Sequence, residues 1–198
     1  MNRALIALLM LTACTTSPTQ VVTLPPIQVE APAPLAWKNA AWDRELYAAI
    51  DREGLTKLTP QDAKDFALDP TKPEAWARLL VEMARFESSF KPTTTYTEAF
   101  TDAKGRRVVS TGLFQISVES MGGIGCKVTQ AELLTPERNI QCAVKAFAYY
   151  VRKDSRIAGL GPSQWRGGAR YWAVLRGTNE YTRKALAAIR GAAAKGAR

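Results

Sequence analysis

Apolar side chains recur every three or four residues along much of the chain beyond residue 37, a pattern typical of amphipathic helices. One such helix is expected over residues 42–54, where a glycine marks its end. A short helix is expected over residues 60–66, because a Thr-Pro pair is a common helix start. A third helix, over residues 73–91, has a broad apolar face made of Trp76, Leu79, Leu80, Met83 and Ala84. We therefore expect most of this third helix to be buried.

The pattern changes over residues 95–110, where larger side chains alternate with small ones around a Gly-containing turn. This alternation predicts a small β-hairpin. Helical spacing returns over residues 136–151, and two more helices are expected over residues 163–175 and 179–190. Residues 191–198 are expected to form a flexible tail. The predicted fold class is therefore α+β, mainly α, with one small hairpin.

The amino terminus resembles an export signal. An apolar run after Arg3 is too short for a membrane span, which needs about 20 residues. The run ends in Leu11-Thr12-Ala13-Cys14, which resembles the lipobox of bacterial lipoproteins, where the cysteine is lipidated and becomes the first mature residue. A plain signal peptide with an incidental cysteine is the alternative interpretation.

This resemblance divides the chain. We expect residues 1–13 to be a lipoprotein signal peptide and residues 14–36 to be the lipidated cysteine followed by a proline-rich tether. Residues 37–190 would then form one folded domain. In lipoproteins an Asp directly after the cysteine commonly signals retention in the inner membrane. Its absence favours the periplasmic side of the outer membrane.

Three cysteines remain to be assigned. If Cys14 carries lipid, Cys126 and Cys142 are left as a pair in an oxidising compartment. A disulfide between them would close a loop and stabilise the fold by about 3 kcal/mol. Two separate buried thiols are the alternative.

The composition fits a folded protein and excludes several kinds of chemistry. The chain has 198 residues, of which 46% are hydrophobic and 23% charged, which suits one domain with additions. It has no histidine, which excludes the Ser-His-Asp triad, the Cys-His pair and histidine-ligated zinc. Acid–base chemistry must therefore rest on carboxylates, Lys, Tyr or Cys. No cofactor and no metal are expected.

The net charge of +9 is concentrated near the carboxyl terminus. Residues 152–198 contain eleven basic and two acidic residues. Such a face could meet nucleic acid, anionic lipid or an acidic polymer, or it could be a solvated surface without a partner. Because an export signal takes the chain away from most nucleic acid, an acidic polymer outside the cell membrane is the expected partner of this face.

Glu87 is the clearest candidate for chemistry. It lies at the carboxyl end of a predicted buried helix, where apolar surroundings and the negative end of the helix dipole both oppose ionisation. Both effects raise its pKa, which a general acid working near neutral pH requires. Many glutamates at helix ends are surface residues or caps, so this position alone does not decide the function.

Three motifs in order along the chain add to this: Glu87-Ser88-Ser89-Phe90 with Pro92, then Ser110-Thr111-Gly112-Leu113-Phe114-Gln115-Ile116-Ser117, then Pro136-Glu137-Arg138-Asn139-Ile140. Together they resemble the motifs of the soluble lytic transglycosylases, which belong to the lysozyme-like superfamily. The order and spacing of the motifs carry the resemblance, which spans residues 72–190. It implies a lysozyme-like fold with Glu87 as the single catalytic acid and base.

The resemblance also implies residues that bind the substrate. The family's Gly-Leu-Met-Gln motif is matched here with Phe114 in place of Met, and Gln115 would line the sugar cleft. Tyr171 matches the tyrosine of the Ala-Tyr-Asn motif, although Trp172 replaces its asparagine, and Tyr181 resembles a later tyrosine. The expected substrate-binding set is Ser88, Ser110, Gly112, Phe114, Gln115, Asn139, Tyr171 and Tyr181.

The implied activity is cleavage of the β-1,4 bond between N-acetylmuramic acid (MurNAc) and N-acetylglucosamine (GlcNAc) in peptidoglycan, with formation of 1,6-anhydroMurNAc. We expect the chain to be a monomer that is attached to the membrane by its lipid anchor. A lysozyme-type hydrolase is the alternative, and its second carboxylate would be Glu98 or Asp102, both of which we expect to face solvent. A catalytically silent peptidoglycan-binding lipoprotein is a further alternative. The later aromatic residues could stack on sugars or pack in the core: Phe114, Tyr149, Tyr150, Tyr171 and Trp172.

Overall fold

The structure is a computed structural model that describes residues 34–197. Three predicted features lie outside the described residues. They are the signal peptide (residues 1–13), the lipidation site Cys14, and the tether (residues 14–36) as far as residue 33.

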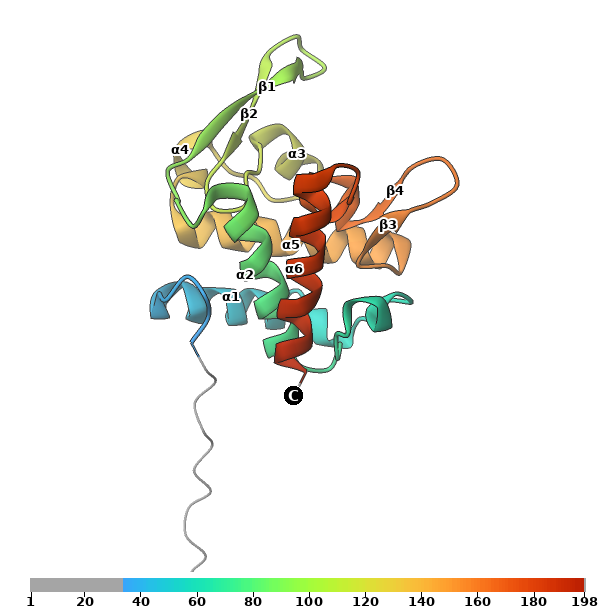
Figure 1. Cartoon of the computed structure of the whole chain (residues 1–198). Helices are drawn as coiled ribbons and strands as arrows, with labels where there is room; N and C mark the ends of the chain where they lie inside the picture. The colour runs from blue at the N-terminus through green and yellow to red at the C-terminus, as the bar shows by residue number, and fades with distance from the viewer. Residues whose placement is uncertain (1–33, 198) are drawn as a thin grey trace, which may run out of the picture. The chain divides into compact units, whose positions relative to one another are not determined.

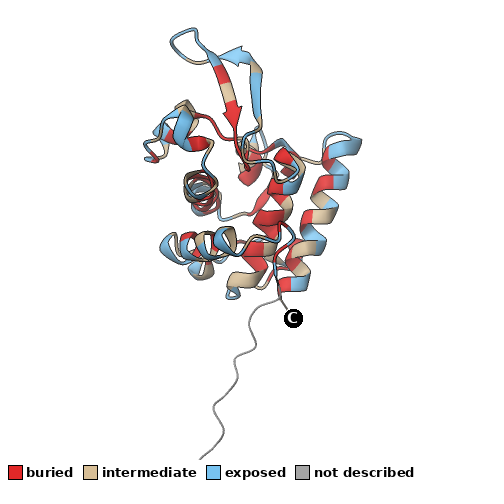
Figure 2. Ribbon diagram, turned by 90° about the vertical axis from the view of Figure 1, so that its left-hand side faces the viewer, coloured by how far each residue is buried: buried red, intermediate tan, exposed pale blue. Residues whose placement is uncertain are grey.

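Long helices form the body of the domain and bear out most of the helical pattern. They are α1 (Ala40–Arg52), α2 (Pro73–Ser88), α5 (Pro136–Asp154) and α6 (Glu180–Gly196). Helix α6 packs along α2, and α1 packs against α5 and α2 (Figure 1). Each helix presents its apolar residues to the others, so buried residues gather where the helices meet (Figure 2).

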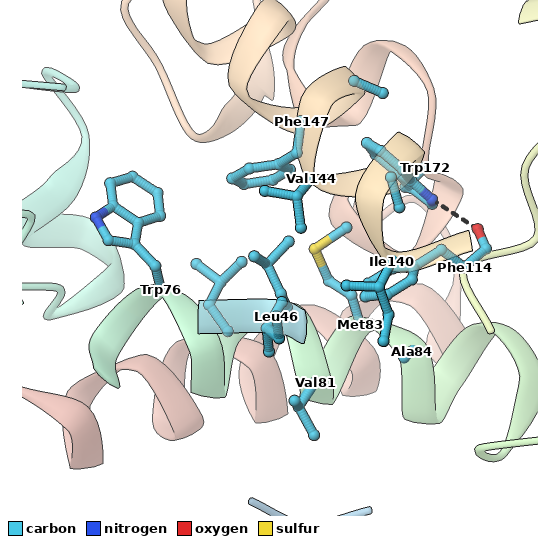
Figure 3. Close-up of a cluster of buried hydrophobic side chains, with 14 of the residues drawn as sticks. Leu46, Trp76, Val81, Met83, Ala84, Phe114, Ile140, Val144, Phe147 and Trp172 are labelled. Atoms are coloured by element: carbon cyan, nitrogen blue, oxygen red, sulfur yellow. Dashed lines mark hydrogen bonds between the residues drawn. The ribbon is translucent and has the colours of Figure 1, made fainter. Parts of the chain in front are cut away.

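The core between these helices is made of large apolar side chains. The residues labelled in Figure 3 are Leu46, Trp76, Val81, Met83, Ala84, Phe114, Ile140, Val144, Phe147 and Trp172, and each is at most 2% exposed. The indole N–H of Trp172 donates to the carbonyl oxygen of Phe114 at 2.9 Å, which satisfies a polar group inside the core. Burying one such large side chain stabilises the fold by about 1.5–3 kcal/mol.

The predicted hairpin projects from one end of the helices (Figure 1). It consists of β1 (Thr95–Thr101) and β2 (Arg107–Thr111), which pair antiparallel. The register is irregular between Thr97 and Thr101, where β1 holds more residues than β2. Two short helices follow in the chain, α3 (Val118–Gly123) and α4 (Gln130–Leu133).

The predicted helix over residues 60–66 was wrong. The segment forms turns, and a 3₁₀ helix covers Ala63–Phe66, after another 3₁₀ helix at Leu55–Lys57. The physical reason is the carboxylate of Asp62, which accepts hydrogen bonds from the backbone N–H groups of Ile157 (2.7 Å) and Ala158 (3.1 Å). The acidic side chain thus ties this segment to a distant strand and does not cap a local helix.

The predicted helix over residues 163–175 was also wrong. Strands β3 (Ala158–Leu160) and β4 (Trp165–Gly167) form a second antiparallel hairpin, which is followed by 3₁₀ helices at Gly168–Arg170 and Ala173–Leu175. Gly167 has a φ of 57°, and a Cβ atom there would lie 2.2 Å from the carbonyl oxygen of Arg156. A glycine is therefore needed at a position where the helical pattern suggested continuous helix.

The carboxyl-terminal helix does not fray at Gly191, contrary to the flexible tail predicted for residues 191–198. Helix α6 continues to Gly196, and Ala193 and Gly196 are buried. A Cβ atom at position 196 would lie 2.6 Å from the backbone of Ala75, so a residue without a side chain permits this close approach of α6 to α2. Packing on α2 thus orders a segment whose composition suggested disorder.

The predicted disulfide is present. Cys126, in the loop after α3, is bonded to Cys142 on α5, with Cα atoms 5.6 Å apart. It ties a loop of irregular structure to a core helix, which restricts the unfolded chain and so stabilises the fold.

Candidate active site

A cleft of about 810 Å³ opens between the β1–β2 hairpin and the segment that leads into α6. It collects Glu87 at the carboxyl end of α2, residues of the Ser110–Ser117 motif, and Tyr171 with its neighbours. The lining residues are Glu87, Thr94, Thr95, Tyr96, Glu98, Phe100, Val108, Ser110, Gln115, Ser117, Ser120, Arg170, Tyr171, Trp172, Ala173, Arg176 and Tyr181.

Glu87 lies in the last turn of α2, which ends earlier than predicted, at Ser88. The next two residues, Ser89 and Phe90, have φ values of 53° and 62°. Left-handed backbone at non-glycine residues is strained and is often found at functional sites. The turn redirects the chain at once, so the helix end stays open to the cleft.

Burial raises the pKa of the Glu87 carboxyl to about 8, and the negative charge of Glu98 adds to the effect. The charge of Arg176 acts in the opposite direction. Within residues 34–197, no hydrogen-bond donor or ion-pair partner contacts this carboxyl. The group is thus held in its neutral form near neutral pH, as the sequence analysis predicted.

Glu98 occupies a position that the sequence analysis did not anticipate. Its side chain was expected to face solvent, but it lines the cleft and accepts a hydrogen bond from the hydroxyl of Ser110 at 2.6 Å. Asp102, the other candidate for a second carboxylate, forms an ion pair with Arg106 at the hairpin turn and does not line the cleft. The cleft therefore contains two carboxyl groups, Glu87 and Glu98.

Gln115 and Tyr171 line the cleft as predicted. The amide of Gln115 donates to the carbonyl oxygens of Thr94 (3.0 Å) and Gly112 (2.8 Å), which fixes the side chain. The hydroxyl of Tyr171 accepts a hydrogen bond from the backbone N–H of Ser117 at 3.0 Å, and burial raises its pKa to about 12. Tyr171 therefore stays protonated and can donate its own hydrogen.

Tyr181 also lines the cleft, at the start of α6. Its hydroxyl donates to the carbonyl oxygen of Phe86, and its ring meets that of Phe86 edge to face at 5.7 Å. These contacts join α6 to the residue that precedes Glu87. Tyr181 is thus a fixed wall of the cleft beside the candidate acid.

Four residues of the expected substrate-binding set lie behind the cleft and do not line it. Phe114 is fully buried in the core, and the hydroxyl of Ser88 donates to the carbonyl oxygen of Leu113 at 2.9 Å. Asn139 is fully buried, and a Cβ atom at Gly112 would lie 2.2 Å from its amide nitrogen. These residues match the family motifs because they hold the loop that carries Gln115, and none of them lines the cleft.

Asn139 is the centre of this support. Its side-chain oxygen accepts from the N–H of Phe114 at 2.9 Å, and its amide donates to the carbonyl oxygens of Thr111 (2.8 Å) and Leu133 (2.9 Å). One side chain from α5 thus satisfies three buried backbone groups.

Arg176 was missed by the sequence analysis. Its guanidinium group donates to the carbonyl oxygens of Ala169 (2.9 Å), Arg170 (3.2 Å) and Tyr171 (3.3 Å), and burial lowers its pKa. One arginine in a strongly basic segment carries no signal in the sequence, because its neighbours have the same charge. The three backbone contacts distinguish it, and they come from a fold that the helical pattern did not predict.

The described residues contain neither a candidate metal site nor a candidate membrane span. In residues 34–197 no three Cys, Asp or Glu side chains gather in a way that could hold a metal ion. Over the same range, no helix is both long enough and apolar enough to span a bilayer. The other aromatic candidates, Tyr149 and Tyr150, do not line the cleft, and Trp172 reaches it from the core.

Replacing Asn139 by Ala should lower the free energy of unfolding by about 2–3 kcal/mol, because it leaves buried backbone groups without partners. Urea unfolding followed by circular dichroism measures this loss. Gln115→Ala is the matched control, which should change stability by less than about 1 kcal/mol because its partners are only partly buried. Equal stability of Asn139→Ala and the unsubstituted protein would contradict the supporting role.

Comparison with known proteins agrees with this architecture. The model of the Transglycosylase SLT domain family matches residues 66–160. Wild-type DslA (Bd0314) is 36% identical in sequence, has a TM-score of 0.73, and the match covers 80% of this chain and 95% of that chain. Two Glu-to-Gln variants of DslA are each 35% identical to this chain. The match to the first has a TM-score of 0.71 and covers 78% of this chain and 90% of that chain. The match to the second has a TM-score of 0.73 and covers 81% of this chain and 96% of that chain.

The two glutamates substituted in those variants have the same spacing along DslA as Glu87 and Glu98 have here. No curated protein matches the chain significantly in sequence. The similarity to DslA nevertheless spans almost all of that protein, and the family model covers the segment from before α2 to β3. The chain therefore belongs to the Transglycosylase SLT domain family and has its lysozyme-like fold.

Proposed function

We propose that the chain is a peptidoglycan lytic transglycosylase, which cleaves the β-1,4 bond between MurNAc and GlcNAc and leaves a 1,6-anhydroMurNAc end. The observation that carries this proposal is the Glu87 carboxyl lining an open cleft, with a pKa of about 8. At pH 7 such a group is mostly protonated, and this is the state that can donate a proton to a glycosidic oxygen.

In the first half of the reaction, the Glu87 proton moves to the glycosidic oxygen, and the bond between that oxygen and C1 of MurNAc breaks. The acetamido group of the same sugar can support C1 from the opposite face, so no protein nucleophile is required. Arg176 favours the carboxylate that remains, because its charge lowers the pKa of Glu87. Its backbone contacts hold this charge in the cleft wall throughout.

In the second half, the Glu87 carboxylate takes the proton from the C6 hydroxyl of the same MurNAc. The C6 oxygen bonds to C1, which closes the 1,6-anhydro ring and returns Glu87 to its protonated form. A buried carboxylate is a stronger base than an exposed one, so the same raised pKa serves both halves. Gln115, Tyr171 and Tyr181 line the cleft, where they would contact the sugar rings around the reacting bond.

Hydrolysis is the second candidate function, and the position of Glu98 favours it. A hydrolase of this kind uses two carboxyl groups, and Glu98 lines the same cleft as Glu87. The hydrogen bond from the hydroxyl of Ser110 fixes the position of the Glu98 carboxyl group in the cleft, as a general base for water would need. The two glutamates substituted in DslA have the same spacing as Glu87 and Glu98, which supports a role for Glu87 and Glu98 as a pair.

The proposed location follows from the sequence alone. A lipid on Cys14 would attach the chain to the periplasmic side of the outer membrane, and the proline-rich residues would extend the domain toward the wall. The basic carboxyl-terminal quarter would face the carboxylates of the peptidoglycan, and the chain would act as a monomer without a cofactor.

Digestion of purified peptidoglycan distinguishes the functions. The unsubstituted protein should release fragments with 1,6-anhydroMurNAc ends, identified by mass spectrometry, and Glu87→Gln should reduce the release by about 10²- to 10⁴-fold without loss of the fold. Fragments heavier by one water would identify a hydrolase. Release of no soluble fragments would identify a wall-binding protein.

The pH dependence of cleavage tests the assigned proton donor. Activity should fall as the pH rises through about 8, because Glu87 loses its proton. Glu98→Gln should move this fall to lower pH, and Arg176→Gln to higher pH, since the two charges shift the pKa of Glu87 in opposite directions. The midpoint of this fall is measured by the release of dyed fragments from labelled peptidoglycan between pH 5 and pH 10. A midpoint that neither variant moves would contradict the assignment.

Stability should depend on the same proton. The folded-state pKa of Glu87 lies above its ordinary value of 4.5, so the folded state binds more protons than the unfolded chain between those values. Stability from this group is therefore present at low pH and is lost as the pH rises from about 5 to about 8. Glu87→Gln should remove that loss in thermal unfolding measured over the same pH range.

Replacing Cys14 by Ala should release the protein from membranes, because no lipid can be attached. Fractionation of cells that express the full chain measures the distribution between membrane and soluble fractions. Cys126→Ala is the matched control for loss of a cysteine, and it should leave membrane attachment unchanged. Continued membrane association of Cys14→Ala would contradict lipidation at this residue.

A further inference from the structure

Residues 35–38 form a short buried segment before α1. Leu35, which the sequence analysis assigned to the tether, is 2% exposed, and Trp37 is 8% exposed. The N–H of Lys38 donates to the carbonyl oxygen of Leu35 at 3.0 Å, which closes a tight turn. This segment lies outside residues 66–160, which the family model matches. The family match therefore assigns it no role.

Contacts from α1 fix the indole ring of Trp37. Its N–H donates to the carboxylate of Asp43 at 2.5 Å, and its ring meets that of Trp42 edge to face, with the ring centroids 5.6 Å apart. The start of α1 is in turn held by Asn39, whose side-chain oxygen accepts hydrogen bonds from the N–H groups of Ala41 and Trp42. The indole is thus held in one orientation relative to α1.

The same indole contacts Phe90, in the turn that follows Glu87. The two ring centroids are 6.3 Å apart, and the rings meet edge to face. Ser89 and Phe90 both have left-handed backbone, which non-glycine residues keep only where the surrounding structure holds it. Many tryptophans are buried in protein cores, but this one touches a strained residue three positions from the candidate proton donor.

The strained turn connects Glu87 to the opposite side of the cleft. After the turn, Thr94 lines the cleft, and its carbonyl oxygen accepts hydrogen bonds from the N–H of Gly112 (2.8 Å) and the amide of Gln115 (3.0 Å). The turn therefore sets how the end of α2 meets the loop that carries Gln115. If the turn relaxed toward continued helix, the two would separate, and water would reach the Glu87 carboxyl.

We propose that Trp37 is a positioning residue of the active site, which holds the turn after Glu87 through its contact with Phe90. Trp37 does not line the cleft, so it acts on the turn and not on the substrate. The inference rests on the proposed function. It assigns part of the geometry of the site to a segment outside the family match.

The test compares Trp37→Ala with Trp37→Phe, which keeps a ring opposite Phe90. Trp37→Ala should release dyed fragments from peptidoglycan about 10- to 100-fold more slowly, because the proton donor is displaced. The pKa of Glu87, followed through the ¹³C resonance of its carboxyl, should move from about 8 toward the ordinary value of 4.5 as water reaches the group. Trp37→Phe should retain most of the activity and the pKa, and circular dichroism checks that each variant is folded.

The charges around Glu87 should not contribute to this change in pKa. The charged and titratable groups that act on it or respond to it are Glu98, Arg176, Tyr171 and Tyr181. Among residues 34–197, none of these four has a hydrogen bond or a ring contact with Trp37. A change of pKa in Trp37→Ala therefore reports how well the carboxyl is enclosed.

Two further variants separate positioning from general stability. Val151→Ala is the matched control, because it removes buried side-chain atoms near the carboxyl end of α5. It should lower stability and leave the pKa of Glu87 unchanged. If Trp37 acts through Phe90, adding Trp37→Ala to Phe90→Ala should lower the activity no further.

An unchanged pKa of Glu87 in Trp37→Ala, or an equal change in Val151→Ala, would overturn the inference while the proposed function stands. Independent losses of activity that multiply in the Trp37→Ala, Phe90→Ala double variant would overturn it as well. Failure of the unsubstituted protein to cleave peptidoglycan would contradict both the inference and the proposed function.

Discussion

The carboxyl of Glu87 is enclosed by protein on most sides and has no hydrogen-bond donor among the described residues, which raises its pKa to about 8. Burial and the negative end of the α2 dipole both oppose ionisation of this carboxyl at neutral pH. Two other charged residues of the cleft adjust the pKa of Glu87. Glu98 supports the neutral form, and Arg176 keeps the ionised form attainable when the proton leaves. A group with both states accessible near pH 8 can act first as an acid and then as a base.

The scaffold keeps this carboxyl in place through contacts from distant parts of the chain. The hydroxyl of Ser88 binds the carbonyl oxygen of Leu113, and Asn139 and Trp172 bind the N–H and carbonyl oxygen of Phe114. The end of α2, the loop that carries Gln115, α5 and the segment before α6 therefore meet behind the cleft. Ser88 and Asn139, which belong to the sequence motifs, thus hold the cleft residues in position without lining the cleft themselves.

The sequence predicted those parts of the structure that depend on local pattern. Helices α1, α2 and α5, the β1–β2 hairpin, the disulfide and Glu87 were all expected, because helical spacing, alternation and burial leave a trace in the sequence. The β3–β4 hairpin was not, because Gly167 is required by a backbone contact with Arg156 that no local pattern records. The end of α6 follows from close packing at Gly196. Glu98 was assigned to solvent because the alternation along β1 does not reveal which face of the strand meets the cleft.

A direct titration of the Glu87 carboxyl tests the central claim. In protein labelled with ¹³C at glutamate carboxyl groups, the resonance missing from Glu87→Gln identifies the group, and its chemical shift can be followed from pH 3 to pH 10. The account predicts a midpoint near pH 8, well above the ordinary glutamate value of 4.5. A midpoint close to 4.5 would show that the carboxyl is ionised at neutral pH, and Glu87 could not then be the proton donor.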